Sequence, residues 1–142
     1  DEQIQQSVAE MQFEKRCESA RVLIHTGNIH RKEKKYGEAL NELGDSLKLT
    51  QQVWNECENN PTEEKENANE TTVQVYQNTM TMFQCSTLTS DAFLNMGLIY
   101  AQQKQFTMSE EKLMQAKLWR VKSIKFENET QAENDMLSSR LK

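Results

Sequence analysis

The amino-acid sequence predicts an all-α fold, and two observations carry this prediction. The chain of 142 residues contains only one proline and four glycines. A β-sandwich or barrel needs a turn signal every 8–12 residues or so, which this composition does not supply. Apolar residues also recur at helical spacing along most of the chain, as at Leu40, Leu43 and Leu47. We therefore expect a single domain over residues 1–142 with about five to seven helices.

The first part of the chain predicts a leading helix followed by a helical hairpin. Residues 1–19 carry apolar side chains at helical spacing, and Ser19 either caps a new helix or lies within a continuous one. The hairpin spans residues 20–58, with the polar run His30–Lys35 at its turn. Its second helix is expected to begin near Tyr36.

A helix boundary is expected at Asn59, Asn60 and Pro61. Proline disfavours the helical conformation of the residue before it, so the preceding helix ends here. The same residues suit the start of the next helix, with Asn60 as its N-cap and Pro61 at its first helical position.

The second part of the chain predicts one long or degenerate helix and a second hairpin. Residues 61–88 form the middle helix, and Thr87–Ser90 is expected to be a short connection. Residues 90–126 form the second hairpin, with its turn at Gln103–Gln105. Residues 127–142 are polar and form either a docked C-terminal helix or a frayed tail.

Two stretches of the chain resemble each other when Gly27 is aligned with Gly97, and they cover residues 20–50 and 90–120. Small residues let two antiparallel helices approach closely, whereas large ones fill the space between them. Gly44 is expected to mark close packing as well. The alignment pairs Leu23 with Phe93, His30 with Tyr100, Tyr36 with Phe106, Ala39 with Ser109, Leu43 with Leu113 and Ser46 with Ala116.

The stretches GNIHRKEKKYGEALNELGDSLKL and NMGLIYAQQKQF resemble the tetratricopeptide repeat, and the signature residues extend over about 60 positions. The resemblance implies a right-handed solenoid of antiparallel helix hairpins. His30 replaces the usual aromatic residue, and neither repeat has the usual closing proline. The two glycines lie 70 residues apart, about twice the family period, which leaves either a degenerate middle repeat or an elongated one.

The resemblance also implies a function, because the first helices of successive repeats line a concave groove that holds a peptide or helix of a partner. The chain is then a scaffold or adaptor in a larger complex, and its ligand has an acidic end and an apolar anchor. The implied groove residues are Arg21, Ile24, Asn28, Arg31, Lys32, Asp91, Leu94, Asn95, Leu98, Ala101 and Gln102.

Some members of this family hold chaperone C-terminal tails in a carboxylate clamp. Asn28 and Asn95 stand where the asparagines of such a clamp would lie, but Ile24 stands at the place of its lysine. Desolvated carboxylates would therefore have no strong cationic partner, and binding of a chaperone tail is not expected.

No motif of enzymatic or cofactor chemistry is present, so we expect neither catalysis nor a cofactor. His25 and His30 lie about 140° apart around a helix and cannot both face one metal ion. Cys17, Cys57 and Cys85 form no CxxC pair, and we interpret them as reduced thiols of a cytoplasmic, intracellular protein. No membrane-spanning segment is expected.

The run His30–Lys35 is interpreted as the only basic cluster, either as an exposed turn or as a rim for an acidic peptide. Nucleic acid is not an expected partner, because the net charge is −5 and no aromatic residues interleave this run. Two alternatives to the adaptor stay open: a purely structural segment of a longer solenoid in a large assembly, and an RNA-binding helical repeat.

Overall fold

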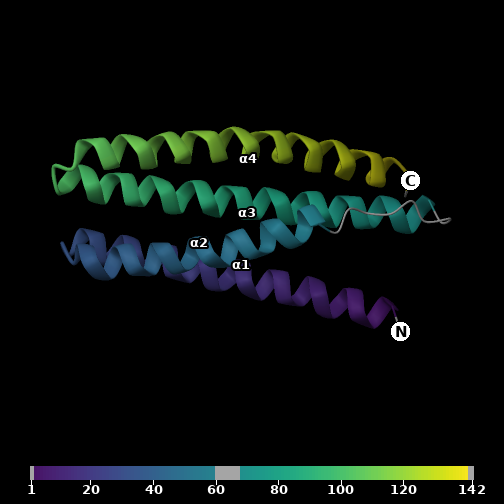
Figure 1. Cartoon of the computed structure of the whole chain (residues 1–142). Coiled ribbons are helices and arrows are strands. Elements are labelled where there is room, and N and C mark those ends of the chain that lie inside the picture. Colours follow the sequence, from purple (N-terminus) through teal and green to yellow (C-terminus); the bar gives the residue numbers. More distant parts are fainter. Residues whose placement is uncertain (1, 60–67, 141–142) are drawn as a thin grey trace.

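A computed structural model describes residues 2–59 and 68–140, with side chains described over residues 12–59 and 77–140. These residues form four long helices: α1 (Glu2–Lys32), α2 (Tyr36–Asn59), α3 (Ala68–Gln102) and α4 (Phe106–Arg140). The described parts of the chain contain no strand, so the all-α prediction is confirmed. The expected five to seven helices are wrong for these parts, because four longer helices take their place (Figure 1).

The helix count differs because residues expected to break helices lie inside them. Helix α1 continues through Ser19, and α3 continues through Thr87 and Ser90, so the predicted connection at 87–90 is wrong. The Thr87 hydroxyl donates to the Phe83 carbonyl at 2.9 Å, which satisfies it within the helix. The Ser90 hydroxyl donates at 2.8 Å to the carbonyl of Ala116 on α4 instead of capping a new helix.

The described residues also include the end of α2, the start of α3 and the last turns of α4. Helix α2 ends at Asn59, where the sequence predicts an end, whereas Asn60 and Pro61 lie outside the described residues. The described part of the middle segment, from Ala68 onward, belongs to α3 and is continuous with the first helix of the second hairpin. Residues 127–140 form the last turns of α4.

The two hairpins have the same turn, 70 residues apart. Lys34 and Lys104 both have a left-handed backbone conformation, with φ of 64° and 61°. The amide of the next residue donates to a helix carbonyl at 2.8 Å in each, Lys35 to His30 and Gln105 to Tyr100. The internal similarity of the sequence therefore corresponds to two equivalent helix–turn–helix units.

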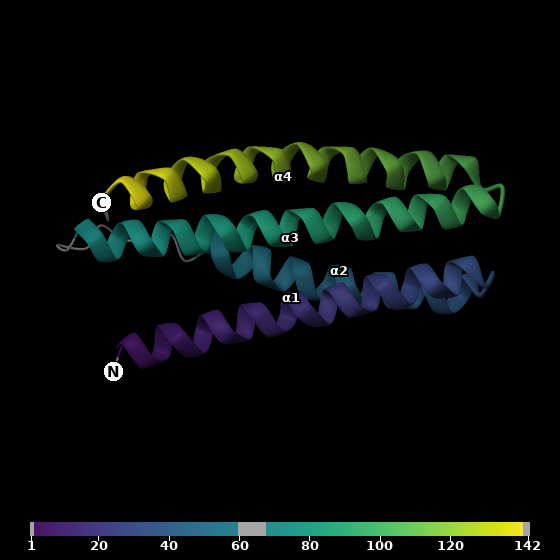
Figure 2. The ribbon, with the colours of Figure 1, turned by 180° about the vertical axis from the view of Figure 1, so that it is seen from behind.

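The hairpins stack so that α3 packs against both α1 and α2, while α4 packs along α3. Figure 1 and the reverse view in Figure 2 show α1 and α2 on one side, α3 between, and α4 outermost. Two clusters of buried side chains hold α3 to the first hairpin. Burial of this apolar surface is the main stabilising term for such an arrangement. The clusters are Cys17, Ala20, Val53, Cys85 and Leu88, and Ala39, Leu43, Ala92, Met96 and Ile99.

Glycine allows close approach at equivalent points of both hairpins. A Cβ atom on Gly27 would lie 3.1 Å from Leu43 Cγ, and one on Gly97 would lie 2.7 Å from Leu113 Cγ. At the second point the Ser109 hydroxyl donates to the Gly97 carbonyl at 2.8 Å. Gly44 has no side-chain or backbone neighbour within 4 Å of such a Cβ, so the expected close packing there is wrong. Among the described residues, no helix has an apolar stretch that would cross a bilayer.

Candidate functional site

The groove residues implied on α1 lie along one side of that helix, and they differ in exposure. Ile24 is half-buried against both core clusters, so it contributes to packing between α1 and α3. Arg21 is exposed and pairs with Glu18 on its own helix. The Arg31 guanidinium donates to Asn28 Oδ1 at 2.7 and 3.2 Å, which occupies the amide oxygen. Lys32 is exposed at the last residue of α1.

The groove residues implied on α3 lie on the second half of that helix. The Asn95 amide donates to the Asp91 carbonyl at 2.9 Å, whereas Leu94 and Leu98 expose 44% and 38% of their surface. Ala101 is half-buried and Gln102 is exposed at the end of the helix.

Two of these residues, Asp91 and Leu94, line a groove with side chains of α4. We call it the α3–α4 groove, and it encloses about 400 Å³. Burial raises the pKa of Asp91, and the neighbouring Arg120 guanidinium opposes this rise. The groove consists of Ser90, Asp91, Leu94, Leu113, Ala116, Lys117 and Arg120.

A second and larger hollow lies between α2 and α4, over α3. We call it the aromatic cleft, and it has a volume of about 510 Å³. The rings of Trp54 and Trp119 meet edge to face with centroids 4.9 Å apart, and Phe126 contacts Trp54 in the same way at 5.7 Å. The cleft is lined by Leu47, Thr50, Gln51, Trp54, Asn55, Glu58, Thr89, Phe93, Trp119 and Lys122.

The cation of Lys122 is held over the tryptophans of this cleft. Its Nζ lies 4.3 Å from the ring centroid of Trp119 and 5.4 Å from that of Trp54. Within the part of the chain that the structure describes, Lys122 forms no ion pair. An ammonium group over two aromatic faces, without a carboxylate partner, can receive an acidic group from a ligand.

The basic run of the first turn is partly neutralised by carboxylates. His30 Nδ1 lies 2.8 Å from Glu42 Oε2 and its Nε2 lies 3.5 Å from Glu38 Oε2, both on α2. Lys35 pairs with Glu33 at 3.3 Å. His30 and Lys35 therefore interact with carboxylates of the first hairpin, and Arg31 donates to Asn28. Lys32 and Lys34 form no ion pair with the residues that the structure describes.

The interpretation of this run as the only basic cluster is wrong. Residues 112–126 carry five cations and no acidic residue, although the whole chain has a net charge of −5. Sequence reasoning also missed the aromatic cleft. Both features had a signal in the sequence: the charge segregation, and the placement of the only two tryptophans, Trp54 and Trp119, in the second helix of each hairpin.

The described residues hold no group of three or more histidine, cysteine, aspartate or glutamate side chains suited to a metal ion. Burial raises the pKa of all three thiols, Cys17, Cys57 and Cys85, and it reaches about 11 for Cys57 and about 12 for Cys85. These thiols are therefore poor nucleophiles at neutral pH.

The aromatic cleft and the α3–α4 groove are two hollows in the described part of the chain where apolar and charged side chains lie together. Comparison with protein-family models, with curated proteins and with solved structures finds no match to this chain.

Proposed function

We propose that the chain is a protein-interaction module, a scaffold or adaptor that binds a partner segment with an acidic group beside an apolar anchor. The observation that carries this proposal is the aromatic cleft with the Lys122 cation over its two tryptophans. The resemblance of both hairpins to the tetratricopeptide repeat supports the same class of function.

The chemistry of the cleft favours a peptide over a small polar metabolite. Tryptophan supplies a large, rigid contact area with little loss of side-chain entropy, and it dominates many protein interfaces. Leu47, Phe93 and the two indoles form an apolar surface for an aliphatic or aromatic anchor. Gln51 and Asn55 supply amide groups for the peptide backbone.

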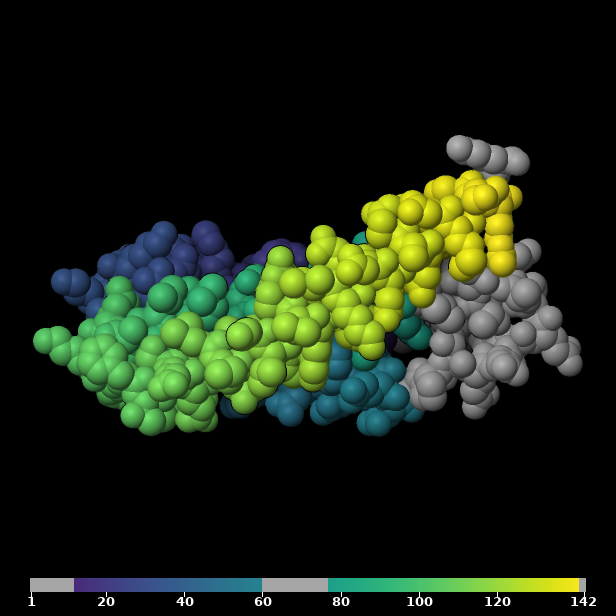
Figure 3. Space-filling model, turned by 90° about the horizontal axis from the view of Figure 1, so that it is seen from above, coloured from purple at the N-terminus to yellow at the C-terminus, as the bar shows by residue number. Residues whose placement is uncertain are grey.

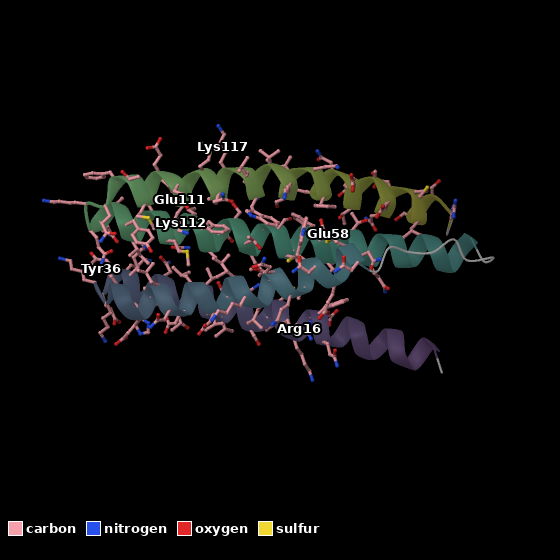
Figure 4. All side chains as sticks on the ribbon, viewed as in Figure 1. Arg16, Tyr36, Glu58, Glu111, Lys112 and Lys117 are labelled. Atoms are coloured by element: carbon pink, nitrogen blue, oxygen red, sulfur yellow. The ribbon has the colours of Figure 1, made fainter. Side chains whose placement is uncertain are left out.

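The two charged side chains of the cleft, Glu58 and Lys122, determine how a ligand with one acidic group is oriented in it. Glu58 lines it from the last turns of α2, and Lys122 lines it from α4 (Figure 4 labels Glu58). Because like charges repel at short range, the acidic group of the ligand is expected beside Lys122 and away from Glu58.

Tryptophan fluorescence reports on the aromatic cleft alone, because Trp54 and Trp119 are the only tryptophans of the chain. We would select binding peptides from a random phage library on the intact chain and titrate them while recording tryptophan fluorescence. We expect acidic peptides with an apolar residue, a fluorescence change on binding, and at least tenfold weaker binding to Lys122→Glu.

The matched control is Lys125→Glu, which makes the same charge change on α4 outside the cleft. Lys125→Glu should weaken binding only slightly, through the general field. Peptides that bind without a fluorescence change, or equally well to Lys122→Glu, would contradict this proposal.

A structural role in a larger assembly is the second candidate, and one observation favours it. Met114, Leu118 and Val121 on α4 expose 52%, 51% and 60% of their surface. Apolar patches of this kind commonly mark contacts with another chain. Sedimentation and urea denaturation of the isolated chain separate the two roles. A monomer that unfolds cooperatively favours an adaptor, whereas aggregation favours a structural segment.

A further inference from the structure

The α3–α4 groove has a counterpart in the first hairpin, 70 residues earlier. Leu113 corresponds to Leu43, and each leucine packs against the equivalent glycine of its own hairpin. Leu43 is 0% exposed, whereas Leu113 is 38% exposed. The difference arises because α3 covers the first hairpin, as shown by the shared cluster of Leu43 with Ala92, Met96 and Ile99.

The same relation holds for the other positions of the groove. Ile24 is half-buried among the residues that receive α3, whereas its counterpart Leu94 exposes 44% of its surface. Thr50 is 2% exposed, whereas its counterpart Arg120 is exposed. Figure 3 looks at the molecule from the α4 side, where α4 lies uncovered with part of α3 beside it. The α3–α4 groove is therefore equivalent to the surface of α1 and α2 on which α3 packs.

We propose that the α3–α4 groove binds an amphipathic helix of a partner protein, laid along the groove as α3 lies on α1 and α2. The helix presents small and aliphatic residues to Leu94 and Leu113, and carboxylates to Lys117 and Arg120. This groove shares no lining residue with the aromatic cleft, so the binding tests for the two surfaces can succeed or fail separately.

The packing of α3 indicates the apolar part of the partner. Helix α3 meets the first hairpin through Ala92, which is fully buried, and through Met96 and Ile99 one and two turns further on. A small residue at the point of closest approach lets the helix axes come together, and larger ones fill the sides. The partner helix needs the same stripe.

The charges of the groove indicate the polar part. Two neutral residues of the first hairpin, Leu47 and Thr50, correspond to the cations Lys117 and Arg120. Lys117 forms no ion pair with any residue that the structure describes, and it points outward from α4 in Figure 4. Asp91 offsets part of the charge of Arg120. A partner with carboxylates at this edge complements the remaining charge.

A second copy of this chain fits the groove less well. Its α1 would present Val22 and Ile29, which correspond to Ala92 and Ile99 and expose 54% and 40% of their surface. However, the residue of α1 that corresponds to Cys85 of α3 is Lys15. The Cys85 sulfur lies 2.9 Å from the Thr50 carbonyl in the first hairpin. At the equivalent place Lys15 would approach Arg120, and like charges repel.

The experiment uses the whole chain and a fluorescent peptide probe with the sequence of residues 79–102. In the chain itself, Thr89 and Phe93 of α3 lie beside Leu47 and Thr50 of the first hairpin. Lys117 and Arg120 are the counterparts of Leu47 and Thr50, so a probe bound in the same way places its positions 89 and 93 beside these two cations. One probe carries Thr89→Glu and Phe93→Glu, and a second carries Lys at both positions; Cys85→Ser removes the thiol from both. We expect the acidic probe to bind at least tenfold more tightly by fluorescence anisotropy.

Variants of the chain test the geometry. Lys117→Glu with Arg120→Glu should reverse the preference between the two probes, a gain that a misfolded variant cannot produce. Leu94→Glu should reduce binding at least tenfold, and Lys125→Glu, which lies outside the groove, should keep the preference. Equal binding of both probes, or binding of neither, overturns the proposal. So does a concentration-dependent dimer of the chain that Leu94→Glu dissociates, since it assigns the groove to a second copy.

Discussion

Leu113 lies so close to Gly97 that a Cβ atom on the glycine would come within 2.6 Å of Leu113 Cδ2 and 3.4 Å of its backbone nitrogen. At that point α3 and α4 approach too closely for a methyl group, because real Cβ contacts shorter than 3.0 Å are essentially absent from folded proteins. The contact explains why a glycine stands inside a 35-residue helix, where alanine would be favoured by helix propensity.

We expect Gly97→Ala to lower the free energy of unfolding by about 1 kcal/mol. Overpacking costs ~1–3 kcal/mol and the gain in helix propensity returns up to ~1 kcal/mol. Gly44→Ala is the matched control, since Gly44 lies inside α2 with open space around it and gains propensity alone. It should raise stability by ~0.5–1 kcal/mol. Urea denaturation followed by circular dichroism measures both, and a stabilised Gly97→Ala would contradict the close packing.

The two equivalent leucines should differ in what they contribute to stability. Leu43→Ala removes a fully buried side chain and should cost ~3 kcal/mol. Leu113→Ala removes one that is 38% exposed and should cost about 1 kcal/mol. Chemical denaturation of both variants measures the difference. Equal costs would mean that α3 does not shield the first hairpin in solution.

The repeat was visible in the sequence because it rests on residue size at fixed spacing. Gly27 with Leu43, and Gly97 with Leu113, meet at the crossing of two antiparallel helices in both hairpins. The turn between the helices repeats with the same backbone geometry at Lys34 and Lys104. Local pattern and tertiary contact agree here, so the pattern was sufficient to predict the pairing.

Helix lengths and the candidate site could not be predicted in the same way. Serine is a favoured helix-capping residue, but the Ser90 hydroxyl donates a hydrogen bond to the Ala116 carbonyl on α4 and α3 continues through it. The aromatic cleft depends on Trp54 and Trp119, which are 65 positions apart and meet only through the stacking of two hairpins. Spacing along one helix does not contain that information.

The edge-to-face contact of Trp54 with Trp119 should carry a measurable coupling energy. It joins α2 to α4, whose backbones do not approach each other within the described part of the chain. Aromatic pairs of this geometry contribute ~0.5–1.5 kcal/mol beyond their buried area. A double-mutant cycle with Trp54→Ala, Trp119→Ala and the double variant should give a coupling of about 1 kcal/mol. Strictly additive costs would show that the two rings do not interact in solution.

The buried thiols should make stability fall at alkaline pH. Burial raises the pKa of Cys85 from 9.0 to about 12, so between these values the unfolded chain loses a proton that the folded chain keeps. A group whose pKa is raised in the folded state contributes fully below the pKa of the unfolded state, and its contribution declines as pH rises above that value. For Cys85 the decline approaches ~1.4 kcal/mol per pH unit.

Cys85→Ala should therefore flatten the pH dependence, even though it lowers stability at neutral pH. The free energy of unfolding of both proteins is measured by urea denaturation in steps from about pH 8 to about pH 10.5, and the difference between them is plotted. The ionisation of lysines and tyrosines largely cancels in this difference, because both proteins share them. The difference should shrink steadily above pH 9.0. A difference that stays constant would mean that the Cys85 thiol ionises as readily in the folded protein as in the unfolded chain.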